Sequence, residues 1–198
     1  MKRFSQFLLE GSFNSVVYHG SNSKFDKFDQ KKARIPNDFY GGGIAYFTDN
    51  LKVGIQYAKG MSTKNGEPRV YTVKLSLKKM FDVDDTFTGK NLIQILPKDV
   101  EGFARGARLL KYGVDKFKVL SDLQSGSLTL SGDEVWGGLS SGQVNTANAR
   151  EYLMAKGYDG LRYNGGDNMG MKVKHNVYLA YYPKSIQIQK VQRVVKKT

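Results

Sequence analysis

Residues with the chemistry of a nucleotide pocket lie near the start of the chain. His19 ends a short β-prone run of Val-Val-Tyr and is followed by Gly20 and Ser21. Because glycine has no Cβ, Gly20 lets the backbone approach a flat ligand closely beside the imidazole. Farther on, a triple glycine precedes Tyr46, and Tyr57 lies on the helix expected next. We expect the imidazole of His19 and the phenol of Tyr57 to face each other across a slot for a planar ring.

The rest of the sequence supports no other class of catalytic site. The chain has no cysteine, which excludes disulfides and thiolate metal sites. It contains no Gly-Lys-Ser/Thr motif, so a P-loop is not supported, and we expect neither a serine-hydrolase site nor a bound metal. The second histidine, His175, is interpreted as a surface residue at a strand end.

Length and composition indicate one domain with a strong positive charge. The chain has 198 residues, of which 40% are hydrophobic, and a net charge of +13. Such a charge predicts attraction to polyanions such as nucleic acid, and a merely solvated surface is the alternative. No apolar run is long enough to span a bilayer and no secretory signal is recognisable. We therefore expect a monomer of the cytoplasm without a membrane partner.

Hydrophobic periodicity predicts an α+β fold with a mainly antiparallel sheet. One helix is expected between an N-cap at Thr48 or Asp49 and a stop at Gly60, and another from 145 or 146 to 156. Strands are expected over 16–18, 44–47, 70–77, 158–163, 177–182 and 186–195, the last of them at a sheet edge.

Residues 82–142 are interpreted as a helical insertion into this domain. The spacing of apolar residues predicts two helices broken near Pro97 and another over 117–123. The stretch from Ser125 to Gly142 is rich in Ser and Gly around the only tryptophan, Trp136, and is expected to be a flexible loop. We expect this insertion to carry the target specificity, since loops on a scaffold often do.

Three motifs taken in order resemble the ADP-ribosyltransferase superfamily, in the diphtheria-toxin-like branch that includes the poly(ADP-ribose) polymerases. They are the His-Gly-Ser sequence at 19–21, the strand Gly-Ile-Ala-Tyr-Phe-Thr at 43–48, and Tyr57 with the alanine after it. Tyr46 and Tyr57 are eleven positions apart (57 − 46 = 11), which is the spacing of that branch.

Two later stretches are similar to phage and bacterial transferase domains. They are Gly-Tyr-Asp-Gly-Leu at 157–161 and Val-Tyr-Leu-Ala-Tyr-Tyr-Pro-Lys-Ser-Ile at 177–186. The whole resemblance covers residues 16–77 and 145–190. It implies the split antiparallel sheet of that superfamily with flanking helices.

The resemblance implies NAD as the substrate and assigns roles to five residues. His19 would hydrogen-bond the adenosine-side ribose, and the backbone of Gly20 would hold the nicotinamide amide with Ser21 beside it. Tyr57 would stack on the nicotinamide ring, with Tyr46 on the other side of the ring. Together these contacts would position the glycosidic bond for cleavage.

The glutamate that completes the family's His-Tyr-Glu set is missing. In the family it begins the strand that here starts Asn176-Val177, and Val177 falls at its position. A carboxylate there would stabilise the oxocarbenium-like transition state, and its loss costs about 3–4 kcal/mol by analogy with oxyanion donors. By resemblance to mono-transferases with an aliphatic residue here, an acid borrowed from the target is one expected substitute. Asp167, on the glycine-rich loop before this strand, is the other, and Glu151 and Asp159 are weaker candidates.

The first ten residues resemble the capsid-targeting peptides on internal head proteins of T-even-type phages. There a maturation protease cuts after Leu-x-Glu and before a small residue, a pattern that Leu8-Leu9-Glu10-Gly11 matches. The implied organisation is a propeptide over 1–10, cleaved between Glu10 and Gly11, and a single domain over 11–198. A helix docked on the body is the alternative. The implied location is the capsid interior beside packaged DNA, and later the host cytoplasm.

We therefore expect an NAD-dependent mono-ADP-ribosyltransferase, a phage effector that modifies a host protein or nucleic acid. The alternative is a catalytically inactive protein of the same fold that inhibits a host factor or binds DNA. The absence of the glutamate and the high charge favour this alternative. A structural head protein that only neutralises packaged DNA is a third hypothesis.

Overall fold

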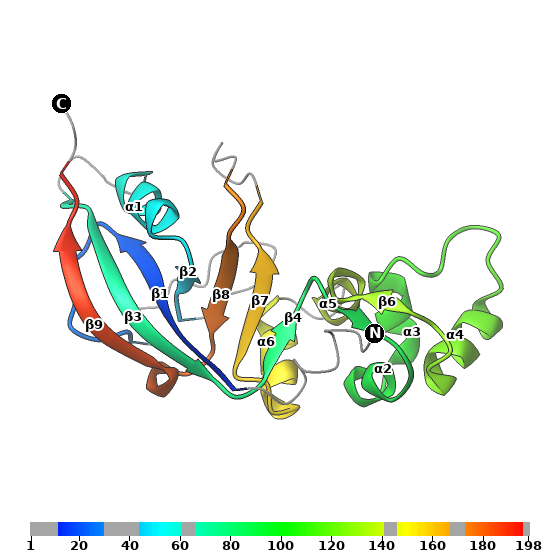
Figure 1. Ribbon diagram of the computed structural model, residues 1–198. Coiled ribbons are helices and arrows are strands. Elements are labelled where there is room, and N and C mark those ends of the chain that lie inside the picture. The colour runs from blue at the N-terminus through cyan, green and yellow to red at the C-terminus, as the bar shows by residue number, and fades with distance from the viewer. Residues whose placement is uncertain (1–11, 30–43, 61–65, 141–145, 167–172, 196–198) are drawn as a thin grey trace, which may run out of the picture. The chain divides into compact units, whose positions relative to one another are not determined.

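The computed structural model describes residues 12–29, 44–60, 66–140, 146–166 and 173–195 (Figure 1). The described residues form two compact units. The first contains residues up to Met80 and from Asp159 onward, and the second contains Phe81 to Tyr158. The predicted α+β fold is confirmed, with a large and mostly antiparallel sheet.

The first unit is built on sheet strands in the order β7-β8-β2-β1-β3-β9, and β4 starts at the last residue of this stretch, Met80. The strands are β1 (Phe13–Ser21), β2 (Tyr46–Thr48), β3 (Arg69–Leu77), β4 (Met80–Asp82), β7 (Gly160–Asn164), β8 (Asn176–Ala180) and β9 (Ile186–Arg193). A 3₁₀ turn (Pro183–Ser185) connects β8 to β9, which lies at the sheet edge as predicted. Helix α1 (Leu51–Gly60) packs on the sheet next to β1 (Figure 1).

Strand β3 shows how the sequence pattern becomes a half-buried sheet. Tyr71, Val73 and Leu75 are fully buried, whereas Lys74 and Ser76 between them are exposed. Successive side chains of a strand point to opposite faces, so the buried residues all lie on one face. β1 pairs with β3 along its whole length, from Phe13 opposite Leu77 to Ser21 opposite Arg69. The core of this unit lies on the Tyr71 face.

The second unit is mainly helical. It contains α2 (Gly89–Ile95), α3 (Val100–Gly106), α4 (Lys116–Ser125), α5 (Gly132–Ser140) and α6 (Thr146–Ala155), with the short strands β5 (Thr86–Phe87) and β6 (Leu130–Ser131). The predicted break near Pro97 is confirmed, because α2 ends before it and α3 begins after Asp99, whose side chain caps Gly102 N.

The flexible loop expected around Trp136 is wrong. Residues 132–140 form helix α5, and the Trp136 side chain is fully buried. The helix begins with a capping box, in which Ser131 Oγ accepts from Glu134 N at 3.2 Å and Glu134 accepts from Ser131 N at 2.8 Å. The glycines serve packing, because a Cβ on Gly138 would lie 2.5 Å from the Phe103 ring. The Ser-x-x-Glu spacing was the sequence signal for this helix.

Candidate nucleotide-binding site

The three strands that carry the predicted site are neighbours in the sheet. Tyr18 of β1 is in register with Thr48 of β2, and Thr48 is in register with Val177 of β8. Residues directly opposite each other in a sheet share a face. A Cβ on Gly54 of α1 would lie 3.0 Å from Tyr18 Cβ and 3.8 Å from Thr48 Cγ2. Helix α1 therefore covers the face to which this row, including Val177, belongs.

Gly20 is the point where β1 and α1 approach most tightly. A Cβ on this residue would lie 2.4 Å from Ala58 N and from Gly54 O, and 2.9 Å from Tyr57 Cβ. Real Cβ atoms do not come this close to backbone, so only glycine fits here. The structure thus brings Gly20 and Tyr57 together, as expected for two sides of one site, and the reason for the glycine is its contact with the helix.

His19 lies on the opposite face of β1 among four aromatic rings. Its ring centroid is 5.2 Å from that of Phe28 in an edge-on arrangement and 5.8 Å from that of Phe47. The rings of Phe25 and Tyr71 are each 6.1 Å away. The side chain is partly buried. This aromatic cluster holds the imidazole in one place.

The hydrogen bonding of His19 defines its neutral tautomer. Its Nδ1 lies 2.8 Å from the carbonyl oxygen of Tyr46. Because a carbonyl oxygen only accepts, Nδ1 must carry the proton and Nε2 keeps a free lone pair in the neutral ring. Burial lowers the pKa of His19 below its usual 6.5, against the opposing effect of the Tyr46 carbonyl. The imidazole is therefore held neutral, with Nε2 as an acceptor for a hydroxyl group.

The chain segment after β1 covers His19 and is fastened by Tyr71. The Tyr71 hydroxyl donates to Ser23 O at 2.8 Å and accepts from Phe25 N at 2.9 Å. The Phe25 ring stacks on the Tyr71 ring, with centroids 4.1 Å apart and planes 6° from parallel. Ser21 ends β1, and its Oγ accepts from Ser23 N at 3.2 Å. These contacts shape the wall of the site on the His19 face.

The two tyrosines lie on the elements predicted for them. Tyr46 is the first residue of β2 and Tyr57 lies in the second half of α1, and both are partly buried. Burial raises the pKa of Tyr57 above its usual 10.0, so the phenol stays protonated. The expectation that His19 and Tyr57 face each other is wrong. Neighbours in a strand alternate, so Gly20 points to α1 and His19 points away from it.

Val177 is buried at the position of the family's glutamate, with 3% of its surface exposed. A carboxylate that the sequence analysis missed lies beside it. Asp49 accepts hydrogen bonds from Asn176 N at 3.0 Å and from Asn176 Nδ2 at 2.6 Å. The two residues are 127 positions apart, and only the register of β2 with β8 brings them together. No local pattern in the sequence could have indicated this contact.

The structure places the two weaker candidate acids in other surroundings. The Asp159 carboxylate accepts from Lys78 N at 2.7 Å and from Lys79 N at 3.0 Å. Glu151 is exposed on α6 in the second unit. Asp167, the predicted substitute acid, and the cleavage position Glu10–Gly11 lie outside the described residues.

His175 was expected at the surface, and this is wrong. It is 5% exposed, and a Cβ on Gly165 of the preceding strand's end would lie 2.1 Å from its Nε2. Its Nδ1 lies 2.9 Å from Val173 O, and among the described residues nothing bonds Nε2. Because Gly165 has no side chain, the His175 ring can occupy the space beside it.

Other kinds of site find no support in the described part of the chain. Residues 138–142 read Gly-Leu-Ser-Ser-Gly, a match to the nucleophile motif of serine hydrolases, but Ser140 ends a helix and donates to Trp136 O at 2.7 Å. Within the described ranges no three metal-ligating side chains gather. The helices that the structure describes are too short or too polar to cross a bilayer.

Comparison with known proteins supports the resemblance drawn from the motifs. The model of a family described as ADP-ribosyltransferase in polyvalent proteins matches residues 11–193. No curated protein and no solved structure matches the chain. Because the family match covers almost the whole sequence, the chain belongs to the ADP-ribosyltransferases of polyvalent proteins.

Proposed function

We propose that this chain is an NAD-dependent mono-ADP-ribosyltransferase. The observation that carries the proposal is the adjacency of β1, β2 and β8, which joins Gly20, Tyr57 and Val177 to one side of one sheet. These three positions come from distant parts of the sequence. They correspond to the nicotinamide-binding glycine, the stacking tyrosine and the missing glutamate of the family.

The geometry at His19 supports a role in binding the donor nucleotide. Its neutral ring presents Nε2 as an acceptor, which suits a ribose hydroxyl. Among the described residues, Tyr18 with Thr48 is the only register pair between β1 and β2. The backbone of Gly20 would bind the amide group of nicotinamide. Tyr57 and Tyr46 would hold the planar leaving group between them.

The proposed chemistry breaks the bond from the nicotinamide ribose to nicotinamide and transfers ADP-ribose to an acceptor nucleophile. Stabilisation of the developing positive charge requires a carboxylate, and Val177 cannot provide one. We assign this role to Asp167 or Asp49. Asp49 is the carboxylate that the described structure bonds to the start of β8. An acid supplied by the target is the third source.

Incubation with labelled NAD and a host lysate tests the proposal, with protein and nucleic acid recovered separately. We expect label in one of the two fractions. Tyr57→Ala should reduce the labelling rate at least about tenfold, because an aromatic contact to the ring is lost, whereas Tyr57→Phe keeps the ring and should retain most of the rate. Asp49→Asn and Asp167→Ala identify the acid, since only the loss of the functional carboxylate should lower the labelling rate about a hundredfold or more.

A catalytically silent binding protein is the second candidate, and the buried Val177 favours it. An NAD titration of the melting temperature separates the two candidates, because a ligand that binds only the folded state stabilises it. A shift without labelling in any fraction would indicate the silent protein. No shift at millimolar NAD would reject the transferase and leave the silent protein or the structural head protein.

The proposed setting is a phage effector carried in the virion and released into the host cytoplasm. The targets proposed are a host protein or nucleic acid, and the basic surface would also contact packaged DNA. The N-terminal propeptide stays a prediction. The mass of the protein taken from virions tests it, because cleavage after Glu10 removes ten residues.

A further inference from the structure

The second unit carries a segment in which large apolar side chains are fully exposed. Residues 111–118 are all exposed, and they connect α3 to α4 and form the first turn of α4. Tyr112 has a relative exposure of 107%, Phe117 of 82% and Val114 of 45%. Single exposed apolar residues are ordinary, but three within six positions form a patch of the kind that marks a binding surface.

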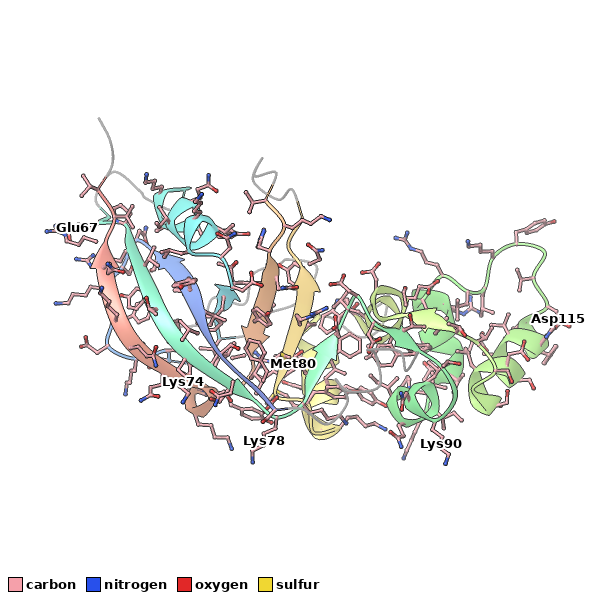
Figure 2. The ribbon with its side chains drawn as sticks, viewed as in Figure 1. Glu67, Lys74, Lys78, Met80, Lys90 and Asp115 are labelled. Carbon is pink, nitrogen blue, oxygen red and sulfur yellow. The ribbon has the colours of Figure 1, made fainter. Side chains whose placement is uncertain are left out.

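This segment has a defined structure at both ends. On the α3 side, Arg108 has a left-handed backbone with φ of 58°, which turns the chain away from the helix. On the α4 side, Asp115 accepts from Phe117 N at 2.9 Å and Lys118 N at 3.2 Å and so caps the helix (Figure 2). Lys116 forms a 2.7 Å ion pair with Glu101 at the start of α3. The exposed rings therefore project from a segment that is held in place at both ends.

Positive charges alternate with the rings along the same stretch. Arg108 and Lys111 precede Tyr112, and Lys116 and Lys118 flank Phe117. All four are exposed. Glu101 neutralises Lys116, and Asp122 pairs with Lys118 at 2.8 Å. Arg108 and Lys111 have no ion-pair partner among the described residues, so their charges are available.

We propose that residues 108–118 bind single-stranded nucleic acid. Exposed aromatic rings stack on unpaired bases, and cations between them neutralise the phosphates that follow each base. A duplex keeps its bases stacked inside and offers no face to Tyr112 or Phe117, so it would use only the charges. A protein partner would fit the rings but would not explain the two available cations, Arg108 and Lys111, beside Tyr112.

This inference goes beyond the proposed transfer reaction and does not depend on it. The segment lies in the second unit, whereas His19, Gly20 and Tyr57 lie in the first. Oligonucleotide binding requires no NAD, so a failure of the transferase proposal would leave this one standing, and the reverse also holds.

The test is fluorescence anisotropy of the full chain with labelled oligonucleotides of about 16 nucleotides, a length within the site sizes of single-strand binders. Single-stranded DNA, single-stranded RNA and duplex DNA form separate arms. We expect Tyr112→Ser and Phe117→Ser each to weaken single-strand binding about tenfold and to leave duplex binding unchanged. Arg108→Gln and Lys111→Gln should each reduce the slope of log K against log salt by about one unit.

Lys74→Gln and Lys78→Gln are the matched charge controls, because they remove exposed lysines of the first unit (Figure 2). They should change single-strand affinity less than Arg108→Gln does. Unchanged melting temperatures show that the ring variants are folded, as expected for exposed side chains. The proposal is overturned if the wild type binds no single strand at low salt, or if both ring variants bind as the wild type does. The second outcome would assign the rings to a protein partner.

Discussion

At the scale of single residues, the proposed binding chemistry depends on the charge state of His19. Four aromatic rings surround the imidazole, and its Nδ1 is engaged with Tyr46 O. Burial among rings disfavours the charged form more than the carbonyl favours it, so the pKa of His19 is lowered. The result is a neutral ring whose Nε2 can accept a hydrogen bond from a hydroxyl group.

The lowered pKa of His19 predicts how stability depends on pH. Above about pH 6.5 the ring is neutral in both the folded and unfolded states and contributes no pH dependence. Below it the unfolded chain takes up the proton first, so the free energy of unfolding falls until the pH reaches the lowered folded pKa. His19→Asn keeps a donor for Tyr46 O but cannot titrate. Thermal melts from pH 7.5 to 5 should therefore show a steeper loss for wild type than for His19→Asn, and parallel curves would contradict the assignment.

At the scale of elements, the packing of α1 on β1 brings the proposed stacking residue to the sheet. Two glycines make this possible, Gly20 on the strand and Gly54 on the helix. Ala58 of the same helix is fully buried. Because both surfaces lack side chains at the contact, the helix backbone reaches the strand, and Tyr57 is placed beside Gly20.

Gly20→Ala should break this contact. The new methyl group would lie 2.4 Å from two backbone atoms of α1, which cannot move aside without shifting the helix. We expect a loss of about 1–3 kcal/mol or more in the free energy of unfolding, together with loss of the NAD-induced melting shift. Chemical denaturation measures the first and thermal melts the second.

Gly113→Ala is the control for that substitution. Gly113 has φ of 82° with open space around its Cα, so an added methyl group meets no atom and only strains the backbone. Gly113→Ala should lower the free energy of unfolding by about 1 kcal/mol and leave the NAD-induced melting shift intact. Equal effects of the two variants would show that crowding at α1 is not the reason for Gly20.

At the scale of the whole molecule, the net charge of +13 opposes the compact state. Each ion pair that the structure describes has at least one exposed partner, as in Glu101 with Arg105 and with Lys116. Solvent-exposed ion pairs contribute little to the free energy of unfolding, so the protein loses little stability when salt screens them. Repulsion among the excess cations is therefore the larger electrostatic effect.

Added salt should consequently stabilise the protein. Between about 0.01 M and about 1 M sodium chloride the screening length falls from about 30 Å to about 3 Å. If this relieves about 1 kcal/mol of repulsion, the melting temperature should rise by about 2–4 °C. Lys74→Glu with Lys78→Glu lowers the charge and should reduce the rise. A melting temperature that falls with salt would show that the ion pairs dominate.

Local patterns were enough to predict much of the fold. The alternation from Tyr71 to Leu77 predicted β3, and the proline at 97 predicted the break between α2 and α3. The start of α1 was predicted with an N-cap at Thr48 or Asp49, whereas Asn50 Oδ1 accepts from Lys52 N at 3.0 Å and caps the helix. The stretch around Trp136 was misjudged, because its glycines indicated a loop while they allow close packing of α5 on Phe103. A high glycine content indicates that the unfolded chain is flexible. It does not reveal which neighbouring side chain packs against each glycine in the folded protein.

The sequence by itself determined the α+β fold, the family and the three chain segments on which the proposed site lies, since these follow from spacing and periodicity along the chain. The tertiary structure alone decided that His19 points away from α1, that Gly20 accommodates a helix, and that Asp49 bonds the start of β8 across 127 residues. Such facts depend on strand register and on the face to which each side chain points. Register is set by the burial of whole strands against each other, so no local stretch of sequence contains it.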